Sequence, residues 1–293
     1  MDGQIPERLC GRPLSAADVD TIRAEIRVAD PPIRSEIARR VCRALDWTNA
    51  LGQPKLMSAR VGLLRLHRAG LIELPAPTGG NGNGRPLKRQ PKAWPQEVAL
   101  VGSVGALSGL RLKPVVDKEA SRLWNGLIDR YHYLGYTPLP GAQVRYLIEA
   151  DAGLLGAIGF GAAAWKVASR DRWIGWDRSG REAHLQRVLN NARFLLLPWV
   201  QVRNLASKVL ALAARQVAED FAERYGARPV LLETYVEIPR HQGSCYRAAN
   251  WRYLGETQGR GKGDRTHRAA LPRKAVYVYP LQADFRRLLG VGQ

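Results

Sequence analysis

The sequence predicts a mixed α/β (α+β) protein in two parts, a small helical domain followed by a larger domain with a mixed sheet. Three observations lead to this prediction. The chain has 293 residues, which is enough for two domains of roughly 100–200 residues each. Apolar residues recur at helical spacing before residue 71, whereas strand-like runs and helical stripes alternate after residue 107. A segment rich in Gly, Asn and Pro separates the two patterns.

Three helices and a strand are predicted in the N-terminal part. Ser15 and Asp18 form a capping-box pattern at the start of the first helix, which Pro31 and Pro32 end. The apolar stripes of the three helices are Val19, Ile22 and Ile26, then Ile33, Ile37, Val41 and Leu45, then Met57, Val61 and Leu64. A short strand follows at Leu71 to Leu74. This order is typical of a winged helix, in which the third helix enters the major groove of DNA.

Basic residues on the predicted third helix are the candidates for contact with duplex DNA. They are Lys55, Arg60, Arg65 and Arg68. Arg and Lys neutralise backbone phosphates, so cations on the helix that enters the groove indicate a DNA-binding face. The alternative is a three-helix bundle with an ordinary solvated basic face.

Residues 77–97 predict a flexible basic linker, because a packed element does not tolerate their density of Gly, Asn and Pro. Arg85, Lys88 and Arg89 are candidates for non-specific phosphate contact, and the alternative is a merely soluble tether. The predicted domains are therefore a winged-helix-like domain at 1–76 and an α/β domain at 98–293.

The C-terminal part has a mixed order of elements. Strands are predicted at 110–116, 144–150, 154–164, 193–200, 230–237 and 275–281, and helices at 117–134, from residue 205 to a cap at Gly226, and at 244–250. This order resembles the GNAT superfamily of acyltransferases over most of residues 107–281. The resemblance implies a GNAT-like mixed sheet and acyl-CoA as the cofactor.

In the GNAT superfamily a turn of the form Q/R-x-x-G-x-G/A binds the pyrophosphate of acyl-CoA at a helix start. Free N–H groups and the helix dipole favour an anion there. The matching run, which Ser207 follows, is Gln201, Val202, Arg203, Asn204, Leu205 and Ala206. Asn204 stands where the family has its middle glycine, and we expect its side chain to obstruct the close approach of phosphate. The alternative is a plain helix start.

Five polar side chains are candidates for the chemistry. The GNAT resemblance puts Tyr246 in the place of the family's general acid, and a phenol with a pKa of roughly 10 keeps its proton at neutral pH. Alternation puts Glu233 and Glu237 on one face of their strand, where Glu233 is a candidate base. With His241, these carboxylates are also a candidate metal site of nuclease type. His132, after the helix at 117–134, is a further catalytic candidate. The alternatives are a packing tyrosine and solvated acids.

A glycine-rich basic run spans residues 255–265. Glycines permit close backbone approach and cations supply charge, so the run suits phosphate or single-stranded nucleic acid. The candidate contacts are Arg260, Lys262, Arg265 and Arg268. The spacing is not that of a P-loop, and the alternative is a disordered basic hairpin tip. For Trp173 and Trp176 we favour a place in the core over stacking on bases.

Six runs, taken in order, resemble the DruA family of the Druantia anti-phage defence system. They are residues 130–135, 173–176, 193–198, 204–207, 233–237 and 246–251. The resemblance covers nearly the whole chain. It implies a role in defence or in mobile elements, with other defence-system proteins as partners.

Charge and hydropathy restrict the partners and the location. Lys plus Arg number 45 against 26 Asp plus Glu, so the net charge is +19, and the isoelectric point is about 10.5. This surplus favours a polyanion such as nucleic acid. The sequence shows neither a spanning apolar run nor the apolar core of a signal peptide, which predicts a cytoplasmic protein without a membrane partner. Three cysteines without C-x-x-C spacing predict reduced thiols.

Three functions follow from these patterns. The first is a DNA-binding defence protein whose C-terminal domain transfers an acyl or related group to a nucleobase or a protein amine, with Tyr246 as acid and Glu233 as base. The second is a non-catalytic DNA-recognition subunit that recruits partners. The third is a metal-dependent nuclease or transposase-like protein that uses Glu233, Glu237 and His241.

Overall fold

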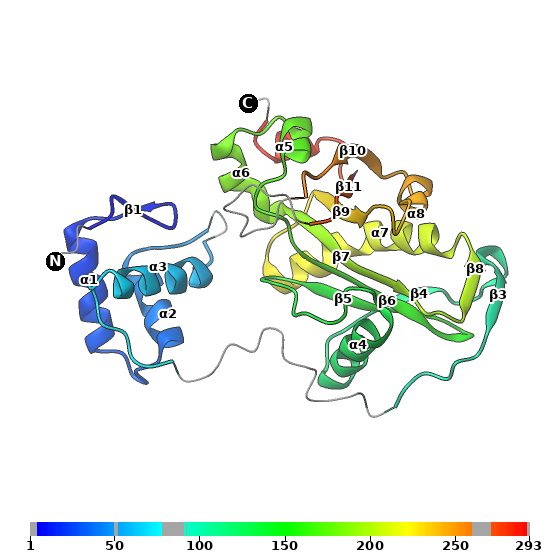
Figure 1. Cartoon of the computed structure of the whole chain (residues 1–293), viewed down its shortest axis with the longest axis horizontal. Coiled ribbons are helices and arrows are strands. Elements are labelled where there is room, and N and C mark those ends of the chain that lie inside the picture. The colour runs from blue at the N-terminus through cyan, green and yellow to red at the C-terminus, as the bar shows by residue number, and fades with distance from the viewer. Residues whose placement is uncertain (1–4, 50–51, 78–90, 92, 260–270, 292–293) are drawn as a thin grey trace. The chain divides into compact units, whose positions relative to one another are not determined.

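The computed structural model describes residues 5–49, 52–77, 91, 93–259 and 271–291. The chain divides into two compact units, Met1–Gly82 and Asn83–Gln293 (Figure 1). Some of the predicted contacts lie outside the described residues, namely those at Arg85, Lys88, Arg89, Arg260, Lys262, Arg265 and Arg268. Within the described ranges, no helix combines the length and the apolar character needed to cross a bilayer.

Three helices form the N-terminal unit. They are α1 (Ala16–Arg27), α2 (Arg34–Ala44) and α3 (Leu56–Arg68), preceded by a short hairpin of β1 (Arg8–Leu9) and β2 (Arg12–Pro13). The predicted capping box is present, because the Asp18 N–H donates to Ser15 Oγ at 3.1 Å and the Ser15 N–H donates to the Asp18 carboxylate at 2.8 Å. Ile22, Ile37 and Leu66 pack at the centre of this unit and are essentially inaccessible to solvent.

The strand predicted at Leu71 to Leu74 is not formed. The Leu71 carbonyl accepts from the guanidinium of Arg23 at 2.9 Å, and the Leu74 N–H donates to His67 Nδ1 at 3.3 Å. Side chains thus satisfy backbone groups that a partner strand would otherwise satisfy. The apolar residues of this run are buried in the helical core. The prediction took a buried coil for a strand, and the strands in the described part of this unit, β1 and β2, lie before α1.

The apolar stripe predicted for α3 is also wrong. Met57 is 67% exposed and Val61 is 43% exposed. The buried face of the helix consists instead of Ala59, Gly62, Leu63 and Leu66. Gly62 allows close packing here, since a Cβ at this position would lie 3.0 Å from Leu9. Apolar residues occur on both faces of α3, so spacing alone does not distinguish the buried face.

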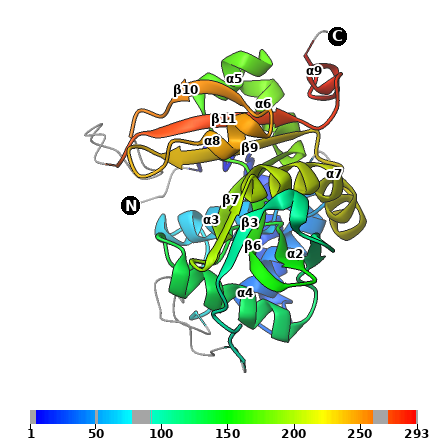
Figure 2. The same cartoon turned by 90° about the vertical axis from the view of Figure 1, so that its right-hand side faces the viewer.

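A seven-stranded mixed sheet forms the C-terminal unit (Figures 1 and 2). In spatial order its strands are β10 (Arg252–Glu256), β11 (Lys274–Pro280), β9 (Leu231–Glu237), β7 (Val188–Leu196), β6 (Gly153–Ala162), β5 (Val144–Ala150) and β4 (Arg111–Pro114). The neighbours are antiparallel except for β7 and β9, which are parallel. A separate parallel pair joins β3 (Leu100–Ser103) to β8 (Val200–Arg203). The mixed α/β class predicted from the sequence is confirmed.

Helices cover both faces of this sheet. They are α4 (Lys118–Tyr131), α5 (Ala168–Ile174), α6 (Arg178–His184), α7 (Leu205–Tyr225), α8 (Ser244–Ala248) and α9 (Phe285–Leu288), with short 3₁₀ turns at Val104–Ala106 and Leu185–Arg187. Adjacent residues of β5 show the two faces. Arg145 donates to Asn125 of α4 at 2.8 Å, and Tyr146 donates to Asp220 of α7 at 2.8 Å. The sheet therefore lies between α4 and α7 (Figure 2).

The parallel strands β7 and β9 pair over only three residues each. Val188, Leu189 and Asn190 face Leu231, Leu232 and Glu233. Beyond them β7 continues beside β6, and β9 continues beside β11. The two strands therefore separate inside the sheet, between its two halves (Figure 1). The strand predicted at 193–200 begins earlier, at Val188, and it is the added residues that make the contact with β9.

Candidate functional site

A cavity of about 410 Å³ lies where β7 and β9 separate, and we call it the cleft. Its walls come from β7, from β9, from the residues after α4 and from the segment that leads into α8. The lining residues are 132–134, 191, 192, 194, 196, 234–237 and 241–246. This volume lies within the range of roughly 300–1000 Å³ that is usual for small-molecule sites.

Tyr246 lies at the base of the cleft. The side chain is 7% exposed, and its hydroxyl donates to Asn191 Oδ1 at 2.7 Å. Thr234 Oγ1 in turn donates to the Asn191 carbonyl at 3.0 Å. Burial raises the pKa of Tyr246 above its ordinary value, so the phenol is protonated at neutral pH. The cleft thus contains a hydroxyl that is held in place and keeps its proton.

His132 forms part of the wall of the cleft. Its Nδ1 accepts the Leu134 N–H at 3.2 Å. Burial first, and then the charges of Arg193 and His241, lower the pKa of His132 to about 4, so the ring is neutral at pH 7. In a neutral imidazole whose Nδ1 accepts, the proton is on Nε2. His132 therefore carries its proton on Nε2 and lacks the free lone pair of a general base.

Tyr133 lies at the mouth of the cleft and is 38% exposed. The guanidinium carbon of Arg240 is 4.8 Å from its ring centroid, and the ring of His132 stacks at 4.9 Å. The ring of His241 lies 5.4 Å away, at an interplanar angle of 61°. Among the described residues that line the cleft, Glu237 is the one carboxylate. Its Oε1 lies 3.5 Å from Arg240 Nε.

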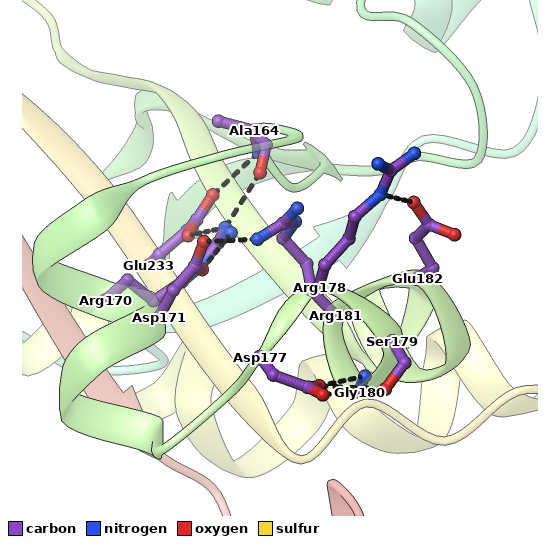
Figure 3. A network of polar contacts seen from close by, with 10 residues as sticks. All are labelled: Ala164, Arg170, Asp171, Asp177, Arg178, Ser179, Gly180, Arg181, Glu182 and Glu233. Carbon is purple, nitrogen blue, oxygen red and sulfur yellow. Dashed lines mark hydrogen bonds and ion pairs between the residues drawn. The ribbon is translucent and has the colours of Figure 1, made fainter. Parts of the chain in front are cut away.

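Glu233, which the sequence suggests as a base, does not line the cleft. Its side chain has no exposed surface and belongs to a buried cluster with Arg170, Asp171 and Arg181 (Figure 3). One carboxylate oxygen accepts the Ala164 N–H at 2.9 Å, and the other accepts from Arg170 at 2.7 Å. The carboxylate is therefore enclosed by protein groups and has no contact with a molecule bound in the cleft.

The metal site suggested for Glu233, Glu237 and His241 is also not formed. Among the described residues, no three His, Cys, Asp or Glu side chains are close enough together to hold a metal ion. The reason is local, because the Glu233 carboxylate bonds to Arg170 while Glu237 bonds to Arg240. Cys10, Cys42 and Cys245 form no disulfide with one another.

The residues predicted to bind a cofactor at 201–207 have different environments. Asn204 and Ser207 line a second cavity of about 650 Å³, beside Lys208 and Arg215 of α7. Leu205 is buried in the core, whereas Gln201 and Arg203 are exposed and Ala206 is half-buried; these four do not line that cavity. Asn204 has φ +63°, and its side chain does not cap α7. Asn is one of the few residues that adopt this backbone region readily, which explains why it can replace glycine here.

The cations predicted on α3 form a second candidate surface, in the N-terminal unit. Lys55, Arg60, Arg65 and Arg68 are all exposed. The structure shows no ion pair for any of the four within its described ranges, whereas on α2 Arg39 and Arg43 both pair with Glu36. We define the α3 face as Met57, Arg60, Val61, Arg65 and Arg68. It combines unpaired guanidinium groups with exposed apolar side chains.

The structure tests the prediction that Trp173 and Trp176 lie in the core. Trp176 is 8% exposed and donates to the Leu289 carbonyl at 2.8 Å, so its predicted place in the core is confirmed. Trp173 is half-buried and stacks on Phe285 at 4.9 Å.

Trp94, at the end of the predicted linker, packs edge-on against Tyr131 of α4 at 6.4 Å. The end of the predicted linker, at Trp94, therefore packs on the C-terminal unit.

These features define a mixed α/β protein whose sheet opens into a polar cleft. The chain belongs to the DruA family, because the family described as Druantia protein DruA matches residues 65–270. Druantia protein DruA of Escherichia coli (strain UMEA 4076-1) is 31% identical over 124 residues, which cover 40% of this chain and 30% of that relative. The match therefore spans less than a third of that protein's length. The resemblance inferred from six sequence runs is confirmed.

The C-terminal unit is also similar to solved acetyltransferase structures. A putative acetyltransferase of the GNAT family from Desulfovibrio desulfuricans has 12% identity and a TM-score of 0.36, covering 59% of this chain and all of that one. A Bacillus subtilis acetyltransferase in complex with CoA has 11% identity and a TM-score of 0.36, covering 59% of this chain and 99% of that one. Likenesses at this level assign no activity.

Proposed function

We propose that this DruA-family protein binds duplex DNA through the α3 face of its N-terminal unit. The observation that carries the proposal is the contrast between neighbouring helices. Arg39 and Arg43 of α2 both pair with Glu36, whereas Arg60, Arg65 and Arg68 of α3 extend into solvent. Phosphate contacts supply affinity, and the apolar side chains of Met57 and Val61 suit thymine methyl groups in the major groove. The net charge of +19 agrees with a polyanionic partner.

A double substitution tests the DNA proposal. We expect Arg60→Ala with Arg65→Ala to weaken duplex binding and to lower the slope of log affinity against log salt by about 2, since each phosphate contact contributes about 0.9. Fluorescence anisotropy over a salt series measures both quantities. The matched control is Arg39→Ala with Arg43→Ala, which removes the same charge from the acid-paired helix. Equal losses in the two variants would show that general charge, not the α3 face, binds DNA.

A second function is proposed for the C-terminal unit, namely transfer of an acyl group from acyl-CoA as the donor substrate. The observation in its favour is that α8 contributes to two cavities. Tyr246 lines the cleft, and Ala248 lines the second cavity, beside α7, which we call the α7 cavity. Asn204, Ser207 and Lys208 offer an uncapped helix start and a cation for a pyrophosphate, and Arg215, roughly three turns further along α7, adds a second cation to the same cavity.

Tyr246 is the proton donor in this proposal. An amine nitrogen of the acceptor forms a bond to the acyl carbon, the carbon–sulfur bond breaks, and the departing sulfur takes the proton of the Tyr246 hydroxyl. The amine loses its own proton to solvent, from which Tyr246 is later reprotonated. The hydrogen bond to Asn191 holds the hydroxyl in one place before the transfer.

Calorimetry with acetyl-CoA tests this second function. We expect saturable binding that weakens by about tenfold or more in Lys208→Ala with Arg215→Ala, because hydrogen bonds to charged groups are lost. Lys118→Ala, on the exposed start of α4, is the control and should bind as the wild type does. Tyr246→Phe should retain binding and lose transfer. If the wild-type protein shows no binding at millimolar acetyl-CoA, the acyl-transfer proposal is wrong.

A further inference from the structure

The mouth of the cleft is a surface of planar groups. Tyr133 is exposed there, with the guanidinium of Arg240 and the rings of His132 and His241 all within 5.4 Å of its centroid. An isolated exposed tyrosine has no special meaning, but this one packs against His132 and Arg240, with His241 edge-on, and the group offers aromatic and guanidinium planes to another flat ring. Nucleobases stack on tyrosine, histidine and arginine planes in this way.

The charge at the mouth is positive. Glu237 is the carboxylate among the described lining residues, and Arg240 neutralises it at 3.5 Å. Arg247 is exposed on α8, where it donates to the Gln242 carbonyl at 2.7 Å, and Arg193 lies close enough to His132 and Tyr133 to influence their pKa values. Such a mouth repels a lysine side chain or a cationic drug and attracts a phosphate backbone.

The interior of the cleft can bind the polar edge of a heterocycle. His132 lines the cleft and has a donor at Nε2–H, because its Nδ1 is occupied by the Leu134 N–H. The Glu237 carboxylate is an acceptor, and Glu is a usual partner for the exocyclic amine of cytosine. A volume of about 410 Å³ is ample for one base with its sugar.

We propose that the cleft takes one unpaired base of a nucleic-acid strand, stacked at Tyr133, with Arg240 and Arg247 at the neighbouring phosphates. This gives the acyl-transfer function proposed above its acceptor class, a nucleobase amine. It also separates two roles, because the α3 face binds the duplex while the cleft receives a base that has left the stack.

Binding of oligonucleotides to the full chain tests the proposal. Fluorescence anisotropy is measured with a labelled single strand of mixed sequence, in the presence of excess unlabelled duplex that occupies the α3 face. We expect Tyr133→Ala to weaken binding about tenfold, the loss typical of one stacked base, and Tyr133→Phe to bind as the wild type does. The matched control is Tyr253→Ala, which removes a tyrosine that is 49% exposed and does not line the cleft.

A second test needs no protein variant. It uses a strand of the same length in which every base is replaced by an abasic site. We expect it to bind about tenfold or more weakly than the intact strand. Equal binding of the two strands, or equal binding by wild type and Tyr133→Ala, would overturn the base site. DNA and RNA strands compared side by side identify which sugar the site accepts.

Acetyl-CoA calorimetry on the same variants keeps the two proposals distinguishable. Tyr133 does not line the α7 cavity, so Tyr133→Ala should bind acetyl-CoA normally. If the strand binds through Tyr133 but acetyl-CoA does not bind at all, the base site stands and the acyl-transfer function fails. If acetyl-CoA binds but the abasic strand binds as well as the intact one, the transfer function stands and the nucleobase acceptor is wrong.

Discussion

At the residue scale, the C-terminal unit contains a buried cluster of four charged side chains. Their contacts explain why Glu233 of β9 has a structural role. Arg170 has no exposed surface; it donates to Glu233, to Asp171 and to the Ala164 carbonyl, while Arg181 donates to the other Asp171 oxygen at 3.2 Å (Figure 3). The two positive and two negative charges balance. Because Glu233 also accepts the Ala164 N–H, the cluster fastens the chain after β6 to β9.

Removing one charge from this cluster should be costly. In Glu233→Gln, Arg170 stays buried without its partner, and we expect the free energy of unfolding to fall by about 3–5 kcal/mol. Urea denaturation measures it. The control is Arg178→Gln, which breaks the exposed pair with Glu182 and should leave the free energy of unfolding close to that of the wild type. A Glu233→Gln protein of wild-type stability would contradict the structural role of this carboxylate.

His132 makes stability depend on pH. Its pKa is about 4 in the folded protein, below the ordinary value of 6.5. Between these values the unfolded chain binds a proton that the folded chain does not, so the contribution of His132 to stability is complete above pH 6.5 and is lost as the pH falls towards 4. We expect the unfolding free energy of the wild type, relative to His132→Gln, to decline over that window and to level off below it. Urea denaturation at several pH values measures the difference, and parallel curves would argue against a buried neutral ring.

At the scale of elements, the cleft depends on which strands pair with β7 along its length. β7 pairs with β6 along most of its length but follows β9 only at Val188, Leu189 and Asn190. Close contact with β6 is possible because Gly156 lacks a side chain, since a Cβ there would lie 2.1 Å from the Leu195 carbonyl oxygen. Gly156 thus allows β7 to stay paired with β6 over the part of β7 that no longer pairs with β9.

A single methyl group tests this arrangement. We expect Gly156→Ala to lower the free energy of unfolding by about 3 kcal/mol, because the clash is with backbone that no rotamer change can relieve. The matched control on the same strand is Gly161→Ala, whose Cβ would meet its nearest atom at 3.6 Å, an ordinary contact. Thermal or urea unfolding compares the two. Similar stability of both variants would mean that β6 shifts without strain.

At the scale of the whole molecule, the two units divide the proposed work. The N-terminal unit, Met1–Gly82, contributes the α3 face, and the unit Asn83–Gln293 contributes the sheet and its cleft. The surplus of positive charge serves both in the proposals made here, because duplex and single strand are bound through the same phosphate chemistry. Nucleic acid is thus the common partner of two sites that use different side chains.

Local patterns determined much of this protein by themselves. The capping box at Ser15, the three N-terminal helices, the long helix capped at Gly226 and the family membership all follow from neighbouring residues, because helix signals act over one or two turns. The basic residues of α3 were identified in the same way, although their lack of ion pairs was not. Tyr246 and His132 were candidates from their runs, although sequence could not show that they share a cavity.

Only the tertiary structure decided the rest. Glu233 is buried because it contacts Arg170, which lies 63 residues away in the chain. Leu71 to Leu74 could form a strand only beside a partner strand, and the structure places none there among the described residues. The exposed face of α3, the separation of β7 from β9 and the planar groups around Tyr133 likewise arise from packing between distant segments. Periodicity reports which residues can be buried, but burial itself is settled by what lies opposite them.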